Sequence, residues 1–476
     1  MVDLAQPVDL DDPGAQSFLE AVQGNIIKGQ GRDHTAHIFL VFPPDAVAMR
    51  EWIAGFAATR VTSARAQHEQ TLAFRRKRDA GAPFVSLLLS AQGYTALGLD
   101  DRAPADPLFR AGLRRHNEVS PDPINDPPVA TWEPGYREGV HAMVLLADDD
   151  RARLDALEST LVADVAALGM RSFVERGDKL LYNFGPPRGV LEIEHFGHQD
   201  GVSNPRMVVA DIEEERAARG AQHWDPQAAL DLVFVDEPGS GAHGSYMVFR
   251  KLEQNVRAFH EAKTGLARLL AIDVDGAATL MVGRHRDGTP VMPTTTLDPR
   301  ADPNDFTYAD DRPQDGVPAR MCPFHAHIRR TNPRGDVPHY IGAPEAFERS
   351  MRIARRGITY GERPYLYNPD PSVLPSAGVG LLFMSFQANL RQFAIQQSGS
   401  DSDTFPFVSQ GAFSGLETVI GQAADAANVR PQVFPYQDAN GPAAVREMRM
   451  INFVKMMGGE YFFAPSLTFL RSLVRL

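Results

Sequence analysis

Four times along the chain, a short apolar run is followed by a longer segment in which apolar residues recur every three or four positions. The first run covers residues 36–42, ends at two prolines and precedes a helical pattern over residues 46–58. A continuous apolar run of this length is typical of a buried strand, whereas a repeat of three to four residues indicates one buried face of a helix. The other three runs cover residues 140–147, 245–252 and 380–387. The pattern therefore predicts four strand–helix units.

Further short apolar runs at residues 84–89 and 279–282 predict extra strands between these units. Two strand–helix units with an added strand can form a split βαβ domain, and a chain of 476 residues is long enough for two such domains. We therefore predict an α+β fold of two domains, with the boundary near Asp200, between the second and third units. Residues 101–134 and 294–320, both rich in proline and aspartate, predict long surface loops.

Charge and cysteine content exclude several classes of protein. The formal net charge of −12 argues against a surface for nucleic acid or for an anionic membrane. The chain begins without a basic segment followed by an apolar one, and no apolar run approaches the roughly 20 residues needed to cross a bilayer. Its single cysteine, Cys322, rules out an intrachain disulfide and fits a reducing compartment. We expect a cytoplasmic protein with no membrane or nucleic-acid partner, and a buried, unreactive Cys322.

Residues 321–334 concentrate two histidines, three arginines and the cysteine. His325 and His327 are two positions apart, so they share one side of the chain only where the backbone is extended. The arginines that follow offer planar donors for carboxylate or phosphate groups. A neutral imidazole beside such arginines suits a haem, with the iron bound to nitrogen and the propionates to guanidinium groups. A metal ion chelated by His325 and His327 is the alternative, and it needs further ligands from elsewhere in the chain.

Two other stretches carry candidate chemistry. Residues 197–201 read Gly-His-Gln-Asp-Gly, and residues 352–361 read Arg-Ile-Ala-Arg-Arg-Gly-Ile-Thr-Tyr-Gly. Taken alone, the first is typical of a tight turn, because Asp-Gly is a common turn pair. Taken alone, the second predicts a helix that ends at a glycine, with arginines favoured at that end by the helix dipole. Their joint occurrence with residues 321–334 changes both interpretations.

Together, the three stretches resemble the signature of the dye-decolorizing peroxidases, a family of haem enzymes. That signature consists of Gly-x-x-Asp-Gly, Cys-Pro-x-x-Ala-His-Ile-Arg and Arg-x-Gly-Ile-x-Tyr-Gly, and all three are present here in that order. Residues 23–29, 380–383 and 459–466 resemble the family's opening helix, a late core strand and its C-terminal signature, so the resemblance covers the whole chain. It implies an α+β fold of the dimeric α+β barrel type, with an N-terminal ferredoxin-like domain over residues 1–200 and a ferredoxin-like, haem-binding domain over residues 201–476.

The resemblance also implies roles by position. His327 would be the proximal ligand of the iron in haem b, with one haem per chain, and Asp200 would be the distal acid–base residue. Arg355 would be the distal arginine and would also contact the haem, while Arg329 and Arg334 are expected to bind its propionates. The implied enzyme reduces hydrogen peroxide to water through a ferryl intermediate and oxidises dyes, phenols or other electron donors. Such chemistry needs a positioned base that becomes an acid, and fixed positive charge beside the departing oxygen.

The resemblance also implies a hydrogen-bond acceptor for the second ring nitrogen of His327, and Asn389 stands at the corresponding position. His325 is expected to pack beside this site without binding the iron. Bulky dyes would be oxidised at an aromatic side chain of the surface, and the candidates are Trp52, Trp132, Trp224, Tyr360 and Tyr461. The sequence is compatible with a homo-oligomer. A haem carrier or iron-releasing protein is the main alternative function, although it has no need for the pair of Asp200 and Arg355.

Overall fold

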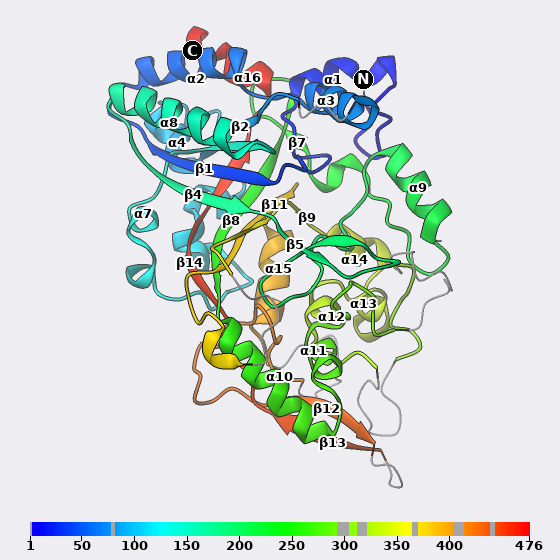
Figure 1. Cartoon of the computed structure of the whole chain (residues 1–476). Coiled ribbons are helices and arrows are strands. Elements are labelled where there is room, and N and C mark those ends of the chain that lie inside the picture. Colours follow the sequence, from blue (N-terminus) through cyan, green and yellow to red (C-terminus); the bar gives the residue numbers. More distant parts are fainter. Residues whose placement is uncertain are drawn as a thin grey trace.

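The computed structural model describes residues 2–77, 81–219, 221–292, 304–311, 321–363, 370–403, 414–437 and 443–476. Within these residues, ten strands form one large antiparallel sheet, and eight of them follow one another in a continuous path. Helices pack on the sheet at one end of the molecule, and a group of shorter helices lies beside its other end (Figure 1). Each half of the path is built from a separate half of the sequence.

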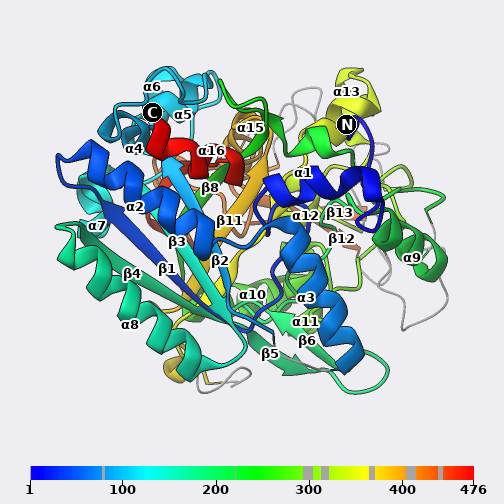
Figure 2. The same cartoon turned by 90° about the horizontal axis from the view of Figure 1, so that it is seen from above.

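The N-terminal half has the element order of a split βαβ domain. In chain order its elements are β1 (His34–Val41), α2 (Ala46–Thr59), β2 (Phe84–Ser90), β3 (Ala142–Asp148), α8 (Arg151–Ala167) and β4 (Arg171–Asp178). The strands lie in the order β4-β1-β3-β2, and α2 and α8 lie over them on one side (Figure 2). The six central residues of β1 are buried, as a continuous apolar run predicts.

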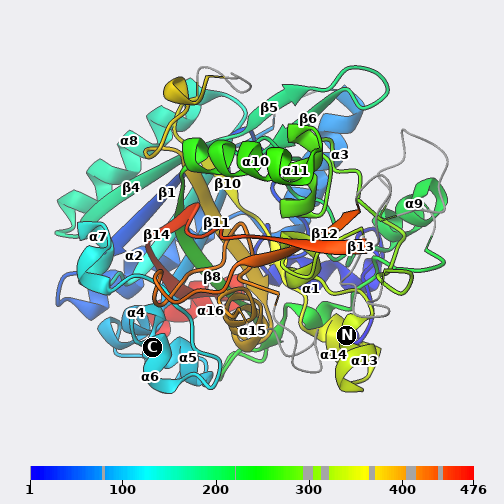
Figure 3. The same cartoon turned by 90° about the horizontal axis from the view of Figure 1, so that it is seen from below.

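The C-terminal half repeats this arrangement. Its elements are β8 (His243–Gln254), α10 (Val256–Leu270), β10 (Ile358–Tyr360), β11 (Gly380–Gln387), α15 (Arg391–Ser400) and β14 (Val454–Ala464). The strands lie in the order β14-β8-β11-β10, which places the first and last strands of the half side by side, as in the N-terminal half. Asn255 caps the start of α10, and its side chain accepts a hydrogen bond from the amide of Ala258. Figure 3 shows α10 at the far end of the molecule from α2. The prediction of an α+β fold with two ferredoxin-like halves is confirmed.

The two halves share one core. Strand β14 pairs with β2 at two positions, which joins the halves into one sheet. At the other ends of the path, β10 contacts β4, and the hydroxyl of Thr359 donates to the carbonyl of Asp178, so the path curves round on itself. Inside, Phe39 of β1 packs edge-to-face on Phe249 of β8, with ring centroids 4.9 Å apart.

The remaining helices lie between or beside the strands. They are α1 (Gln16–Ala21), α3 (Ala64–Lys77), α4 (Ala91–Ala96), α5 (Pro107–Ala111), α6 (His116–Val119), α7 (Pro134–Arg137), α9 (Val209–Arg219), α11 (Val274–Val282), α12 (His327–Thr331), α13 (Asp336–Ile341), α14 (Glu345–Ser350) and α16 (Leu467–Ser472). The remaining strands are β5 (Leu180–Asn183), β6 (Val190–Ile193), β7 (Val235–Asp236), β9 (Ala354–Arg355), β12 (Gln432–Gln437) and β13 (Ala443–Met448).

Three local expectations differ from the structure. Residues 279–282 end the helix α11 and do not form a strand. Residues 352–361 were expected to end a helix, because of their arginines and glycine. They contain instead the strands β9 and β10, which pair with β11. Residues 101–134 contain short helices, and the side chains of Phe109 and Trp132 are buried in the core. The segment is therefore not a surface loop.

Most of the stretch 294–320, expected to be a surface loop, lies outside the described residues. In the described part of the chain, no helix is both long and apolar enough to cross a membrane. Cys322 is buried and burial raises the pKa of its thiol to about 12, which agrees with the expectation of an unreactive side chain.

Candidate active site

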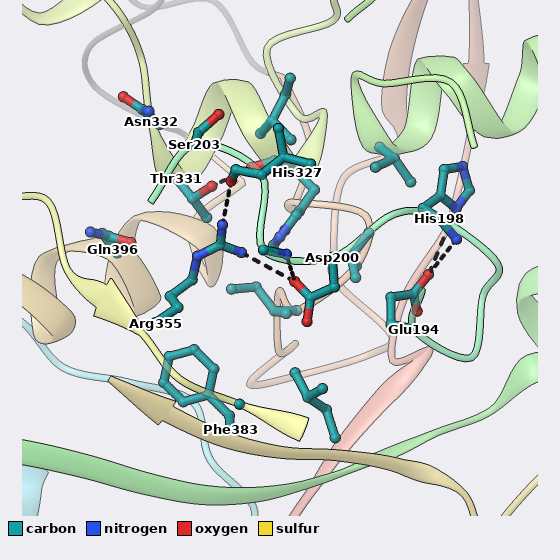
Figure 4. A pocket seen from close by; sticks show the side chains of 18 of the residues that line it. Glu194, His198, Asp200, Ser203, His327, Thr331, Asn332, Arg355, Phe383 and Gln396 are labelled. Carbon is teal, nitrogen blue, oxygen red and sulfur yellow. Dashed lines mark hydrogen bonds and ion pairs between the residues drawn. The ribbon is translucent and has the colours of Figure 1, made fainter. Parts of the chain in front are cut away.

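A cavity lies where the helix α12 faces residues 194–205 across the surface of β8 and β11 (Figure 4). Much of its wall is apolar, and the apolar side chains include Phe196, Leu252, Val282, Ile328, Leu381, Phe383, Phe393, Val419, Ile420 and Val454. Its polar lining includes His327, Asp200 and Arg355. The fold therefore brings together three residues that are far apart in the sequence, since more than a hundred positions separate Asp200 from Arg355.

His327 is the first residue of α12, and a buried carboxylate holds its ring. Its Nδ1 lies 3.2 Å from Oε1 of Glu417, whose side chain is fully buried. Three backbone amides donate to the same carboxylate at 2.5–3.0 Å, those of Val419, Ile420 and Gly421. A carboxylate bound in this way only accepts, so Nδ1 carries the proton and Nε2 keeps its lone pair. In the described chain Nε2 has no hydrogen-bond partner, and it is the nitrogen left to bind iron.

Glu417 is the residue that sequence reasoning missed. Asn389, which falls at this place by position, instead accepts a hydrogen bond from the amide of Arg391 at the start of α15. The prediction for Asn389 is therefore wrong. Glu417 does carry a weak signal, because it is the one acidic residue among small and apolar neighbours in Ser414-Gly-Leu-Glu-Thr-Val-Ile-Gly421. Such an acid in an apolar segment points to a buried partner.

Asp200 and Arg355 form a pair on the side of the cavity opposite α12. Oδ1 of Asp200 lies 3.5 Å from Nη1 of Arg355, and it accepts a hydrogen bond from the amide of Gly201 at 2.6 Å (Figure 4). The other terminal nitrogen of Arg355 donates to the carbonyl of Val202 at 2.6 Å. The backbone of Arg355 is fixed by the pairing of β9 with β11 and by Asn204, whose side chain accepts from its amide at 3.0 Å. A strand therefore positions this guanidinium.

The two arginines expected to bind propionates lie in different places. Arg334 borders the cavity, donates to Oγ of Ser203 at 2.8 Å and stacks on Phe306 at 4.1 Å. Arg329 is fully buried away from the cavity, where it forms ion pairs with Asp336 at 2.7 Å and with Asp311 at 3.0 Å. A guanidinium bound by two carboxylates and a backbone carbonyl has little left to offer a ligand. The geometry gives no support to a propionate contact at Arg329.

His325 turns away from His327. Its Nε2 lies 3.2 Å from the carbonyl of Val433 and its ring packs edge-to-face on Phe434. Burial lowers the pKa of His325 to about 3, so the ring is neutral. No group of three or more histidine, cysteine or acidic side chains that could hold a metal ion occurs in the described ranges. The alternative of a metal ion bound by both histidines therefore finds no support there.

The cavity fits a haem. It offers one imidazole with its second nitrogen held by a carboxylate, broad apolar walls for a macrocycle, and the cation of Arg334 at its border. His198 also lines it, and burial lowers the pKa of that histidine to about 3. Both ring nitrogens of His198 are buried without a hydrogen-bond partner among the described residues. The Nδ1 of His198 lies 3.8 Å from Oε1 of Glu194, so this ring faces a carboxylate.

Comparison with known proteins gives one consistent result over the whole chain, although no family model matches it. The sequence is 39% identical over 472 residues to the multifunctional dye peroxidase DyP2 of Amycolatopsis sp., with 96% of each chain covered. It is 30% identical to the dye-decolorizing peroxidase msp1 of Mycetinis scorodonius, over 82% of this chain and 76% of that protein. The crystal structure of a DyP-type peroxidase of Anabaena sp. superposes with a TM-score of 0.83 at 36% identity, covering 98% of this chain and 97% of the other.

Proposed function

Because the chain belongs to the dye-decolorizing peroxidase family, it is a haem peroxidase that uses hydrogen peroxide, and we propose that His327, Asp200 and Arg355 form its catalytic site. One observation supports this proposal most directly. The pair of Asp200 and Arg355 borders the same cavity as His327 but approaches it from another segment of the chain. A haem carrier needs an iron ligand, but it gives no role to an acid–base residue paired with a cation.

The proposed haem site uses His327 for the iron and Arg334 for a propionate. When bound, the haem supplies the iron centre that reduces peroxide and then oxidises electron donors such as dyes. Glu417 accepts a hydrogen bond from the Nδ1–H of His327, which fixes the orientation of the ring and leaves Nε2 for the metal. Arg329 is left out of the proposed site because carboxylates bind it elsewhere.

Asp200 is proposed to move the peroxide proton. Its Oδ1 is held by Gly201 and Arg355, whereas Oδ2 has no hydrogen-bond partner in the described chain. Oδ2 can therefore accept a proton from one oxygen of hydrogen peroxide and deliver it to the other oxygen, which leaves as water. Arg355 places fixed positive charge where negative charge develops on the departing oxygen.

Replacement of Arg355 by alanine is expected to leave haem binding intact and to lower the second-order rate constant for the reaction with peroxide by about 10²- to 10³-fold, the usual effect of removing one charge-stabilising donor. Stopped-flow absorption at several peroxide concentrations measures this constant. Arg171→Ala is a matched control, because that side chain is 70% exposed and pairs with Glu138 at the surface. Equal rate constants for Arg355→Ala and the control contradict the assigned role.

Replacement of Glu417 by glutamine keeps a hydrogen-bond acceptor beside His327 but removes its charge. We expect haem affinity to fall by about 10- to 100-fold, because partners of this kind orient the ligand and raise its basicity. The reduction potential of the haem is expected to rise, since a less basic imidazole stabilises the ferric state less. Titration of apoprotein with haem and potentiometry measure the two effects. Glu158→Gln, a change of a buried acid on α8 that pairs with Arg176, should leave both unchanged.

The remaining features of the proposal concern the domains, the location and the partners of the protein. The boundary between the two ferredoxin-like domains is placed at residue 200, and its support is that β1 to β6 precede it while β7 to β14 follow. A cytoplasmic location is supported by the single cysteine, and the net charge of −12 supports the absence of nucleic-acid and membrane partners. Phenols join dyes as proposed electron donors, and homo-oligomerisation stays a prediction.

A further inference from the structure

A second pocket lies beside the haem cavity and shares its distal pair. Asp200 and Arg355 line both spaces, but most of the residues that line the second pocket are charged or polar. Lys28 belongs to this lining, and 36% of its side chain is exposed, so the pocket reaches the surface of the molecule. Asp200 therefore stands between an apolar cavity and a polar space that solvent can enter.

A second acid, Glu192 of β6, lines this polar pocket and does not line the haem cavity. Its backbone carbonyl accepts a hydrogen bond from the amide of Asp200 at 3.1 Å, and its neighbour Ile193 forms an antiparallel bridge with Gln199. The carboxyl group of Glu192 forms no hydrogen bond or ion pair within the described part of the chain. The backbone therefore holds two acidic residues against one pocket, and the carboxyl group of Glu192 is unpaired there.

The surroundings of Glu192 favour a proton on its carboxyl group. Burial and the negative charge of Asp200 raise the pKa of Glu192 to about 7, while the charge of Lys179 acts in the opposite direction and that of Asp33 in the same direction. The cations that line the pocket are bound to other groups, namely Lys28 to Asp211, Arg32 to Asp149, Lys179 to Asp33, Arg206 to Glu215, Arg355 to Asp200 and Arg356 to backbone carbonyls. Glu192 therefore gains and loses a proton near neutral pH.

The reaction consumes protons that the peroxide does not supply. One hydrogen peroxide, two electrons and two protons give two molecules of water. Asp200 moves a proton that comes from the peroxide itself, so this transfer supplies neither of the two. Much of the wall of the haem cavity is apolar and has no groups that exchange protons. The polar pocket is therefore the side from which protons can reach Asp200.

The other acids that line the two spaces are bound by donors. Glu194 lines the haem cavity, and its carboxylate accepts hydrogen bonds from two backbone amides and from the side chain of Gln254, at 2.6–2.9 Å. Asp211 lines the polar pocket, and both its oxygens accept from Lys28, at 2.6 and 2.7 Å. Such hydrogen bonds favour the charged form and oppose the uptake of a proton. Glu192 has no bond of this kind in the described ranges.

We propose that Glu192 supplies Asp200 with protons from solvent while the oxidised enzyme is reduced. The carboxyl group of Glu192 gives its proton, through water in the polar pocket, to the free Oδ2 of Asp200. Asp200 passes the proton to the remaining peroxide oxygen, which leaves as the second water molecule. Glu192 is left as a carboxylate and takes a new proton from solvent, and the electron donor supplies one electron for each proton. This inference rests on the proposed peroxidase function and on the role of Asp200 in it.

The test measures the two halves of the reaction separately. Haem-loaded enzyme is oxidised with one equivalent of hydrogen peroxide and then mixed with ferrocyanide, which gives an electron and no proton. Stopped-flow absorption records both steps. In Glu192→Gln we expect a rate constant for peroxide close to that of the wild type, but a return to the resting spectrum that is slower by about 10²-fold, a usual contribution of a positioned proton donor. Asp211→Asn, the matched change at an acid of the same pocket, should alter neither step.

The pH dependence separates proton supply from a structural role. In the wild type the rate of the second step should fall as the pH rises through about 7, because only protonated Glu192 can give a proton. This dependence should be absent in Glu192→Gln and present in Glu192→Asp, which keeps a carboxyl group in the pocket. A wild-type rate and pH profile in Glu192→Gln, or equal slowing of both steps, overturns the inference and leaves the peroxidase function in place. Failure of the wild type to react with peroxide contradicts the function itself.

Infrared spectra of the resting, haem-loaded protein give a readout that does not depend on turnover. The carbonyl stretch of a protonated carboxyl group should weaken in the wild type as the pH rises through about 7, and Glu192→Gln should lack this component. Burial also raises the pKa of Asp401 to about 7, but its band is common to both proteins and cancels in their difference. Identical titrations of the two proteins overturn the assignment of Glu192.

Discussion

Replacement of His327 by alanine is expected to weaken haem binding by more than about 100-fold, which exceeds the usual effect of removing only a partner of the ligand. The cavity would keep its apolar walls and Arg334, so haem could still enter, but no nitrogen would bind its iron. Titration of the apoprotein with haem, followed by the Soret band, measures the loss. Imidazole added to the solution should restore the band in His327→Ala, because the space left by the side chain faces the cavity.

His325→Ala is the matched control two positions away. Its ring packs on Phe434 and takes no part in the cavity, so the change should lower thermal stability and leave the Soret band in place. Retention of haem in His327→Ala together with its loss in His325→Ala would show that the wrong histidine has been assigned. Loss in both, without rescue by imidazole, would point to a folding defect, which circular dichroism can detect.

The fold could be predicted from the sequence because several of its strands, such as β2 and β3, are buried along their whole length. Apolar runs such as that of β3 therefore stand out along the chain, and α2, α8 and α10 begin with side-chain caps at Asp45, Asp150 and Asn255. The wrong assignment of residues 279–282 has the opposite cause. A short apolar run can end a buried helix as well as form a strand, and the cap at Asp273 and the left-handed Gly283 were the features that identify α11.

The site could be predicted only where one short segment carries the chemistry. Asp200, His327 and Arg355 each stand in a recognisable motif, and the fold brings them to one cavity. Glu417 has no such motif, because backbone amides hold its carboxylate and any sequence can supply them. Arg329 shows a second limit. A sequence gives the charge of a guanidinium but not the buried carboxylates that already bind it.

Replacement of Asp200 by alanine is expected to lower the second-order rate constant for the reaction with peroxide by about 10²- to 10⁴-fold, the range for loss of a positioned acid–base group. Haem binding should remain, because His327 and Glu417 lie on the other side of the cavity. Stopped-flow absorption under excess peroxide measures the constant. Asp211→Asn is the matched control, since that residue lines a second pocket together with Asp200 and Arg355, but its carboxyl pairs with Lys28 and the residue does not line the haem cavity.

Asparagine at position 200 separates proton transfer from positioning. It can keep the hydrogen bonds from Gly201 and Arg355, but its amide cannot accept a proton at the pH of the assay. If Asp200 moves the peroxide proton, Asp200→Asn should be as slow as Asp200→Ala. If the asparagine variant reacts at nearly the wild-type rate, the carboxylate serves only to hold Arg355 in place, and the proton must move through another group or through water. The double variant Asp200→Asn, Arg355→Ala then decides the matter, because two residues acting on one proton transfer lose less together than the sum of their separate effects.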